Sequence, residues 1–203
     1  MITNTSDTIP ANRHNQATRL LHAGLALAIL SQLGTSLAMQ GPNDVQAGDL
    51  LFQVHRYSGL AALLLAFCLW LTILLRSRGT EIGALIPWFS GRHLTALWQD
   101  AKTHVGSVLR LRLPENDPQA ALPSAIHGLG LLLISAMAAS GAFYFVQVGL
   151  GLHSADPDGM IAMTVHLALA NLVWIYLIAH AGLAVLHHLL RSMSLATMWS
   201  LGR

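Results

Sequence analysis

Four long apolar runs, separated by polar segments, limit the possible folds of this chain more than any other feature. They are residues 20–39, 50–75, 125–148 and 161–190. A helix needs about 20 residues to cross the hydrocarbon of a bilayer, which is about 30 Å thick. Each of the four runs is at least that long. Only 10% of the 203 residues are charged, against about 25% in a soluble domain. The sequence therefore predicts an all-α integral membrane protein, a bundle of four spanning helices.

The positions of the basic residues predict how the chain is oriented. Ten of its eleven Lys and Arg residues lie before the first run, between the second and third, or after the fourth. The other two connections, 40–49 and 149–160, carry four Asp residues and no Lys or Arg. Because basic residues concentrate on the cytoplasmic side, we expect a multi-pass protein of the bacterial inner membrane with both termini in the cytoplasm.

The chain divides into a polar tail (1–15), one transmembrane domain (16–190) and a short cytoplasmic tail (191–203). Its one long connection, 76–123, is expected on the cytoplasmic side and contains an amphipathic helix. The apolar residues of that helix recur at helical spacing: Leu94, Leu97, Trp98, Ala101, Val105, Val108 and Leu109. Such a helix is typical of the membrane interface. A docking surface for a cytoplasmic partner is the alternative.

Eleven histidines stand out in so apolar a chain, because an ionisable group inside a span is costly and usually marks function. By depth, His22 and His180 lie toward the cytoplasmic face, and His55 and His166 toward the external face. His166 and His180 are 14 residues apart, which is about 21 Å along a helix and within about 40° of one face. The last span would therefore present one histidine near each side of the bilayer.

Haem iron is six-coordinate when two neutral imidazoles bind it from opposite sides, and two facing helices can supply them. The pairs that match in depth are His22 with His180 and His55 with His166, so we expect two haem b groups. His187, seven residues beyond His180 on nearly the same face, is a rival ligand.

Two other interpretations of the histidines remain open. They could serve packing alone, or a metal carrier could use them. Zinc and copper sites usually include carboxylates or thiolates, whereas no Asp or Glu lies inside any apolar run and Cys68 is the only cysteine.

Two arginines beside these histidines are expected to contact haem propionates. Arg56 follows His55 and is the only basic residue expected on the external side, while Arg19 precedes His22 by three residues. A guanidinium binds a carboxylate through two parallel hydrogen bonds. An arginine that merely extends to water at the interface is the alternative.

Two further histidines are weaker candidates for hydrogen bonding to a quinone. His127 lies near the cytoplasmic start of the third run, and His104 lies in the amphipathic segment. Either one could equally be an ordinary interfacial residue.

Three short motifs accompany these histidines. They are Arg19-Leu20-Leu21-His22, His55-Arg56-Tyr57-Ser58-Gly59, and Val165-His166 with Ile178-Ala179-His180. Over about residues 16–190 the chain resembles the prokaryotic cytochrome b561 family and the related cytochrome b subunits of nickel-iron hydrogenases, formate dehydrogenases and thiosulfate reductases. The separation of the two histidines in the last span is the most specific part of the resemblance.

The resemblance implies a four-helix bundle in which the first and fourth spans ligate one b haem, and the second and fourth spans ligate the other. It also implies electron exchange with ubiquinone or menaquinone and with a redox partner, often a periplasmic protein. The long cytoplasmic connection is more similar to the subunit type than to the compact members that oxidise superoxide. We expect an electron-transfer subunit in contact with membrane lipid and not with nucleic acid, and a homodimer is left open. The alternatives are a stand-alone superoxide oxidase that reduces ubiquinone, and a haem-free scaffold or metal carrier.

Overall fold

The computed structural model describes residues 16–43, 45–75, 80–110 and 120–190. Within these ranges the regular structure is entirely helical. The helices are α1 (Gln16–Ser36), α2 (Leu50–Leu75), α3 (Ile82–Leu85), the 3-10 helix η1 (Pro87–Phe89), α4 (Gly91–Leu109), α5 (Ala121–Gly149) and α6 (Ile161–Leu189). The predicted tails, 1–15 and 191–203, lie outside the described residues.

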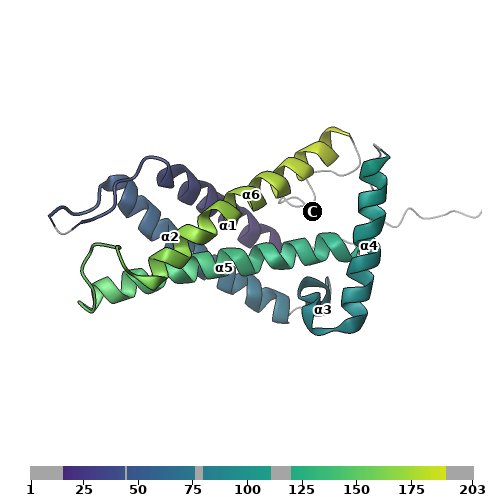
Figure 1. Ribbon diagram of the computed structural model, residues 1–203, viewed down its shortest axis with the longest axis horizontal. Coiled ribbons are helices and arrows are strands. Elements are labelled where there is room, and N and C mark those ends of the chain that lie inside the picture. Colours follow the sequence, from purple (N-terminus) through teal and green to yellow (C-terminus); the bar gives the residue numbers. More distant parts are fainter. Residues whose placement is uncertain (1–15, 44, 76–79, 111–119, 191–203) are drawn as a thin grey trace, which may run out of the picture.

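Four long helices run along the long axis of the molecule, and one lies across its end. Figure 1 shows α1, α2, α5 and α6 crossing one another at their middles, with α4 transverse at one end. The connections after α1 and after α5 both lie at the opposite end. We call these two ends the α4 end and the loop end. In this arrangement the first residues of α1 and the last residues of α6 lie toward the α4 end.

All four long helices contribute to one buried cluster. Its members are Ala28, Ile29 and Leu33 of α1, Ala62 of α2, Ile134 of α5 and Val173 of α6. Small side chains such as Ala62, which is 1% exposed, let helices approach closely where lipid supplies no hydrophobic drive between them. A hydrogen bond of 3.0 Å from Trp70 Nε1 to Ser135 Oγ also links α2 to α5.

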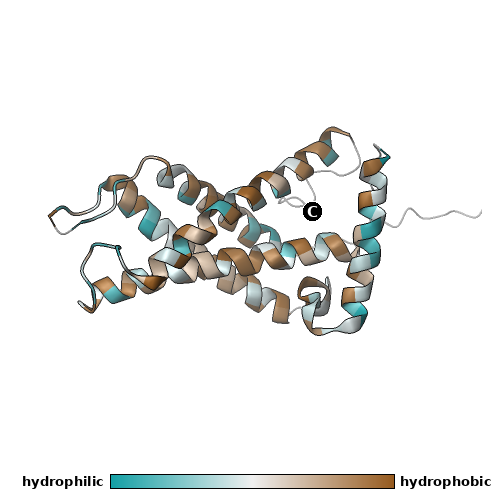
Figure 2. Ribbon diagram, viewed as in Figure 1, coloured by the Kyte–Doolittle hydropathy of each residue, from teal (hydrophilic) through white to brown (hydrophobic). Residues whose placement is uncertain are grey.

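Three of the described helices, α2, α5 and α6, are long and apolar enough to cross a membrane. Figure 2 shows hydrophobic residues along their lengths. The structure thus supports three of the four predicted spans by length and composition. α1 has 21 residues but is not among these helices. Its polar residues, which include Arg19, His22 and Gln32, lower its hydropathy, so the first span stays a prediction.

The structure places α4 in the region where the sequence predicts an amphipathic helix. Asp100 of α4 accepts a hydrogen bond of 2.7 Å from the backbone N–H of Leu122 through its Oδ2, so it satisfies a free amide at the start of α5. α5 begins at Ala121, four residues before the predicted run. Pro123 falls in its first turn, where a helix needs no amide donor.

The short helix α3 packs directly on the backbone of α5. A Cβ atom added at Gly128 would overlap the carbonyl group of Leu85. The absence of a side chain at Gly128 is therefore what allows the two backbones to meet there.

Candidate functional site

The four histidines singled out by depth form two facing pairs, one toward each end of the molecule. At the loop end, the rings of His55 in α2 and His166 in α6 have centroids 6.2 Å apart. Toward the α4 end, the rings of His22 in α1 and His180 in α6 have centroids 6.4 Å apart. α6 contributes to both pairs because its two histidines are 14 residues apart on one stripe.

The spacing of the rings tests whether a metal ion fits between them. A first-row metal ion lies about 2.0 Å from a histidine nitrogen that binds it, and that nitrogen lies about 1.1 Å from the ring centre. Two imidazoles bound from opposite sides therefore have centroids about 6.2 Å apart. Both pairs have this spacing. The residues present thus fit a cofactor whose iron takes two axial imidazoles.

His55 is held through its Nδ1 atom by α1. This nitrogen lies 3.0 Å from Thr35 Oγ1 and 3.2 Å from the carbonyl oxygen of Gln32. A carbonyl oxygen only accepts hydrogen bonds, so Nδ1 carries the proton. The lone pair of the neutral ring is then on Nε2, which is available to bind a metal.

His166 is held in the same way by α5. Its Nδ1 lies 3.0 Å from Ser140 Oγ and 3.0 Å from the carbonyl oxygen of Met137. The neighbouring Gly141 allows this close approach, because a Cβ there would lie 3.2 Å from Cε1 of the His166 ring. Both rings of the loop-end pair therefore carry their proton on Nδ1 and leave Nε2 as the ligand atom.

Gln32 joins α1 to α2 beside this pair. Its Nε2 donates to Ser58 Oγ at 2.7 Å and to the carbonyl oxygen of His55. Gln32 and Thr35, two of the polar residues that make α1 less apolar than the other long helices, are thus used in contacts with α2. Gln32, Thr35 and Ser140 are not among the site residues predicted from the sequence. In the sequence, the only signal for such contacts is the run of polar residues in the first apolar segment.

Arg56 lies next to the loop-end pair in a setting that suits an anion. Its guanidinium carbon lies 4.8 Å from the ring centroid of Tyr57 and 5.1 Å from that of Phe145. Its Nη2 atom donates to Tyr57 Oη at 2.9 Å. The buried Nε atom has no hydrogen-bond partner among the described residues. Arg56 therefore packs against two aromatic rings, and its buried Nε–H is available for an acidic ligand such as a propionate.

The pair toward the α4 end has two further rings around it. Tyr176 stacks on His180 with centroids 5.4 Å apart and planes 13° apart. The ring of His127 lies edge-on to His180, with centroids 5.1 Å apart. That separation is too short for a metal ion bound between the two rings, so the spacing favours His22 as the partner of His180. Arg19, one turn before His22, is buried, with 5% of its surface exposed.

The two quinone candidates occupy different settings. His127 adjoins His180, and its Nδ1 lies 2.6 Å from the carbonyl oxygen of Pro123. His104 instead contacts Asp100 on its own helix, with 3.0 Å between Nδ1 and Oδ1. Of the two, His127 is the one that the structure places against a histidine pair.

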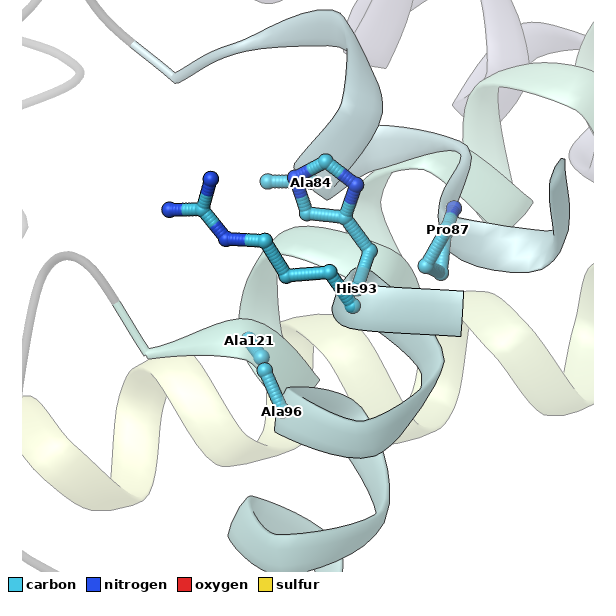
Figure 3. A pocket seen from close by; sticks show the side chains of 6 residues that line it. Ala84, Pro87, His93, Ala96 and Ala121 are labelled. Atoms are coloured by element: carbon cyan, nitrogen blue, oxygen red, sulfur yellow. The ribbon is translucent and has the colours of Figure 1, made fainter. Parts of the chain in front are cut away.

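A separate small cavity lies between α3, η1, α4 and the start of α5. It has a volume of about 170 Å³ and is lined by Ala84, Pro87, Arg92, His93, Ala96 and Ala121 (Figure 3). None of the paired histidines lines it. Within the described ranges, no group of three or more His, Cys, Asp or Glu side chains is arranged to hold a metal ion.

Apolar helices around two pairs of facing imidazoles define a class of membrane protein that can hold haem between its helices. The comparison with protein families agrees with this class, because the model described as prokaryotic cytochrome b561 matches residues 13–201. The chain belongs to this family, as its motifs predicted. Neither the curated proteins nor the solved structures gave a match. The protein is accordingly a membrane protein of a family that binds haem b and transfers electrons.

Proposed function

We propose that this protein is a di-haem cytochrome b that carries electrons across a bacterial inner membrane, between a redox partner and the quinone pool. The observation that carries the proposal is the presence of two histidine pairs toward opposite ends of the molecule. Their ring spacings of 6.2 and 6.4 Å each suit one metal ion with two axial imidazoles.

The residues divide between two haem sites. His55 and His166 would ligate the loop-end haem, and His22 and His180 would ligate the haem toward the α4 end. Each bound haem supplies a one-electron couple, whose potential depends on its ligands and on the polarity around it. The apolar helices exclude water from both sites and so lower the polarity around each haem.

Arginines would balance the charge of the haem carboxylates. Arg56 would bind a propionate at the loop end through its buried Nε–H, while its guanidinium packs against the rings of Tyr57 and Phe145. Arg19 would have the corresponding role near His22. Each arginine lies within one turn of a ligand on the same helix, so its charge is fixed close to the haem that the ligand holds.

We propose that α1 is the fourth span and that the loop end faces the periplasm. α1 contributes Ala28, Ile29 and Leu33 to the shared buried cluster, and its Gln32 bonds to α2, so it belongs with the other three long helices. The distribution of basic residues along the sequence supports a cytoplasmic location for the α4 end and both termini.

The transverse helix α4 would then lie in the cytoplasmic membrane interface. Its side chains Leu94, Trp98, Val105 and Leu109 are exposed, and the Lys102 ammonium lies 5.7 Å from the centroid of the Trp98 ring. Apolar and aromatic residues beside a basic residue suit the boundary between acyl chains and phosphate groups. Figure 1 shows α4 across the ends of the long helices, which is the direction that an interfacial helix requires.

A quinone would react at the α4 end, where His127 lies against His180. Because the Nδ1 proton of His127 is directed to the carbonyl oxygen of Pro123, Nε2 of the neutral ring would accept a hydrogen bond from the hydroxyl group of a ubiquinol or menaquinol. The redox partner would exchange electrons at the loop end, with the haem between His55 and His166.

The first test is a dithionite-reduced minus oxidised spectrum of the purified protein, with haem quantified per chain. Two low-spin b haems per chain are expected. Colourless protein would refute the proposal and favour a haem-free scaffold. Reduction of the haems by a ubiquinol or menaquinol analogue tests the quinone link, and no reduction by either would remove it. Rapid reduction on mixing with superoxide would instead identify a self-sufficient superoxide oxidase.

A further inference from the structure

We infer that Thr35 and Ser140 are positioning residues that orient the two loop-end histidines and lower the reduction potential of the haem they hold. This inference rests on the proposed function. The two hydroxyl groups lie outside the sequence motifs. Their effect on the reduction potential is expected for only one of the two haems.

The hydroxyl of Thr35 can only accept a hydrogen bond from His55. Its Oγ1 lies 2.7 Å from the carbonyl oxygen of Ser31 and 3.1 Å from that of Gln32. Both oxygens are acceptors, so the hydroxyl proton is directed to the backbone of α1. The lone pairs of Oγ1 then face the His55 Nδ1 proton at 3.0 Å.

The same arrangement occurs independently on α5. Ser140 Oγ donates to the carbonyl oxygen of Met137 at 2.8 Å, and its lone pairs face the His166 Nδ1 proton at 3.0 Å. In both cases the imidazole meets a hydroxyl and the carbonyl three residues earlier on the neighbouring helix. Two helices thus present one matching pair of acceptors to each ring of the loop-end pair.

Two acceptors on Nδ1 have two consequences for a ligand. They fix the ring orientation and the tautomer, so that Nε2 stays directed to the metal, and they make the ligand more basic. A more basic imidazole stabilises the ferric over the ferrous state, which lowers the reduction potential. Removing either hydroxyl should therefore raise the potential of the loop-end haem and leave the other haem unchanged.

The test is a redox titration of the full-length protein carrying Thr35→Val or Ser140→Ala, with electron paramagnetic resonance spectra of the ferric haems. We expect an upward shift of one of the two potentials and altered g values for the same haem. Thr35→Ser keeps the hydroxyl and should restore both readouts. The matched control is Thr72→Val. This substitution also removes a threonine hydroxyl from a long helix, but Thr72 Oγ1 donates only to the carbonyl oxygen of Cys68 within α2.

Unchanged potentials and g values in both Thr35→Val and Ser140→Ala would overturn the inference. Loss of one haem in Thr35→Val, with retention in Thr35→Ser and Thr72→Val, would support it. Equal haem loss in Thr35→Ser and Thr35→Val would overturn it, because the hydroxyl would then not be the cause. Failure of the proposed function is distinct, since wild-type protein would then lack two haems before any substitution is made.

Discussion

Substitution of His22 by Ala should remove one haem and leave the other. His22 belongs to the pair toward the α4 end, and α6 separates the two pairs by 14 residues, or about 21 Å. Sites more than about 10 Å apart with no shared partners respond independently to substitution. The haem content should therefore fall from two per chain to one. The 5.1 Å between the His127 and His180 rings is too short for His127 to take the place of His22 without movement.

The assay is a pyridine haemochrome measurement against protein concentration, followed by a redox titration of the haem that remains. The retained haem should titrate at the potential of one of the two wild-type haems. His166→Ala should retain the other haem, so the two variants together account for both wild-type potentials. His153→Ala is the control, because His153 is exposed in the connection after α5 and should leave two haems. Two haems in His22→Ala, or none, would refute the assignment of the pairs.

Three other substitutions test the charge and the packing. Arg56→Gln removes a positive charge beside the loop-end haem and should lower its reduction potential, as measured by redox titration, whereas Arg92→Gln in α4 should not. Gly128→Val should force α3 away from α5 and destabilise the protein by about 1–3 kcal/mol, while Gly34→Ala, which has open space around its Cβ position, should not; thermal unfolding followed by circular dichroism distinguishes them. Trp70→Phe removes the hydrogen bond to Ser135 and should cost about 0.6–2 kcal/mol in the same assay, and an unchanged stability would show that the bond contributes nothing.

α1 shows where composition stops being informative. Its sequence is too polar to rank with the other three long helices, although it contributes to the shared core. Hydropathy sums all faces of a helix, whereas the polar residues Gln32 and Thr35 of α1 contact α2 and His22 faces α6. Composition alone cannot separate a helix with a polar contact surface from one that does not enter the membrane.

The start of α5 is a second feature that the local sequence does not predict correctly. The apolar pattern predicted a start at residue 125, but the helix begins at Ala121. Pro123 is compatible with a first turn, and the carboxylate that satisfies the amide of Leu122 comes from Asp100, on another helix. A helix start that depends on a residue 22 positions away cannot be recognised from the residues that flank it.

By itself, the sequence determined the class of the protein, its apolar helices and the four histidines of the two pairs. These follow from local rules, because a helix in hydrocarbon must satisfy its own backbone hydrogen bonds and a 14-residue spacing returns to nearly the same face. Only the tertiary structure decided which side chains meet the rings. Thr35 is 20 residues from His55, and Ser140 is 26 residues from His166. Their contacts depend on how neighbouring helices are rotated and crossed, which the packing of side chains along the whole bundle sets and no local pattern records.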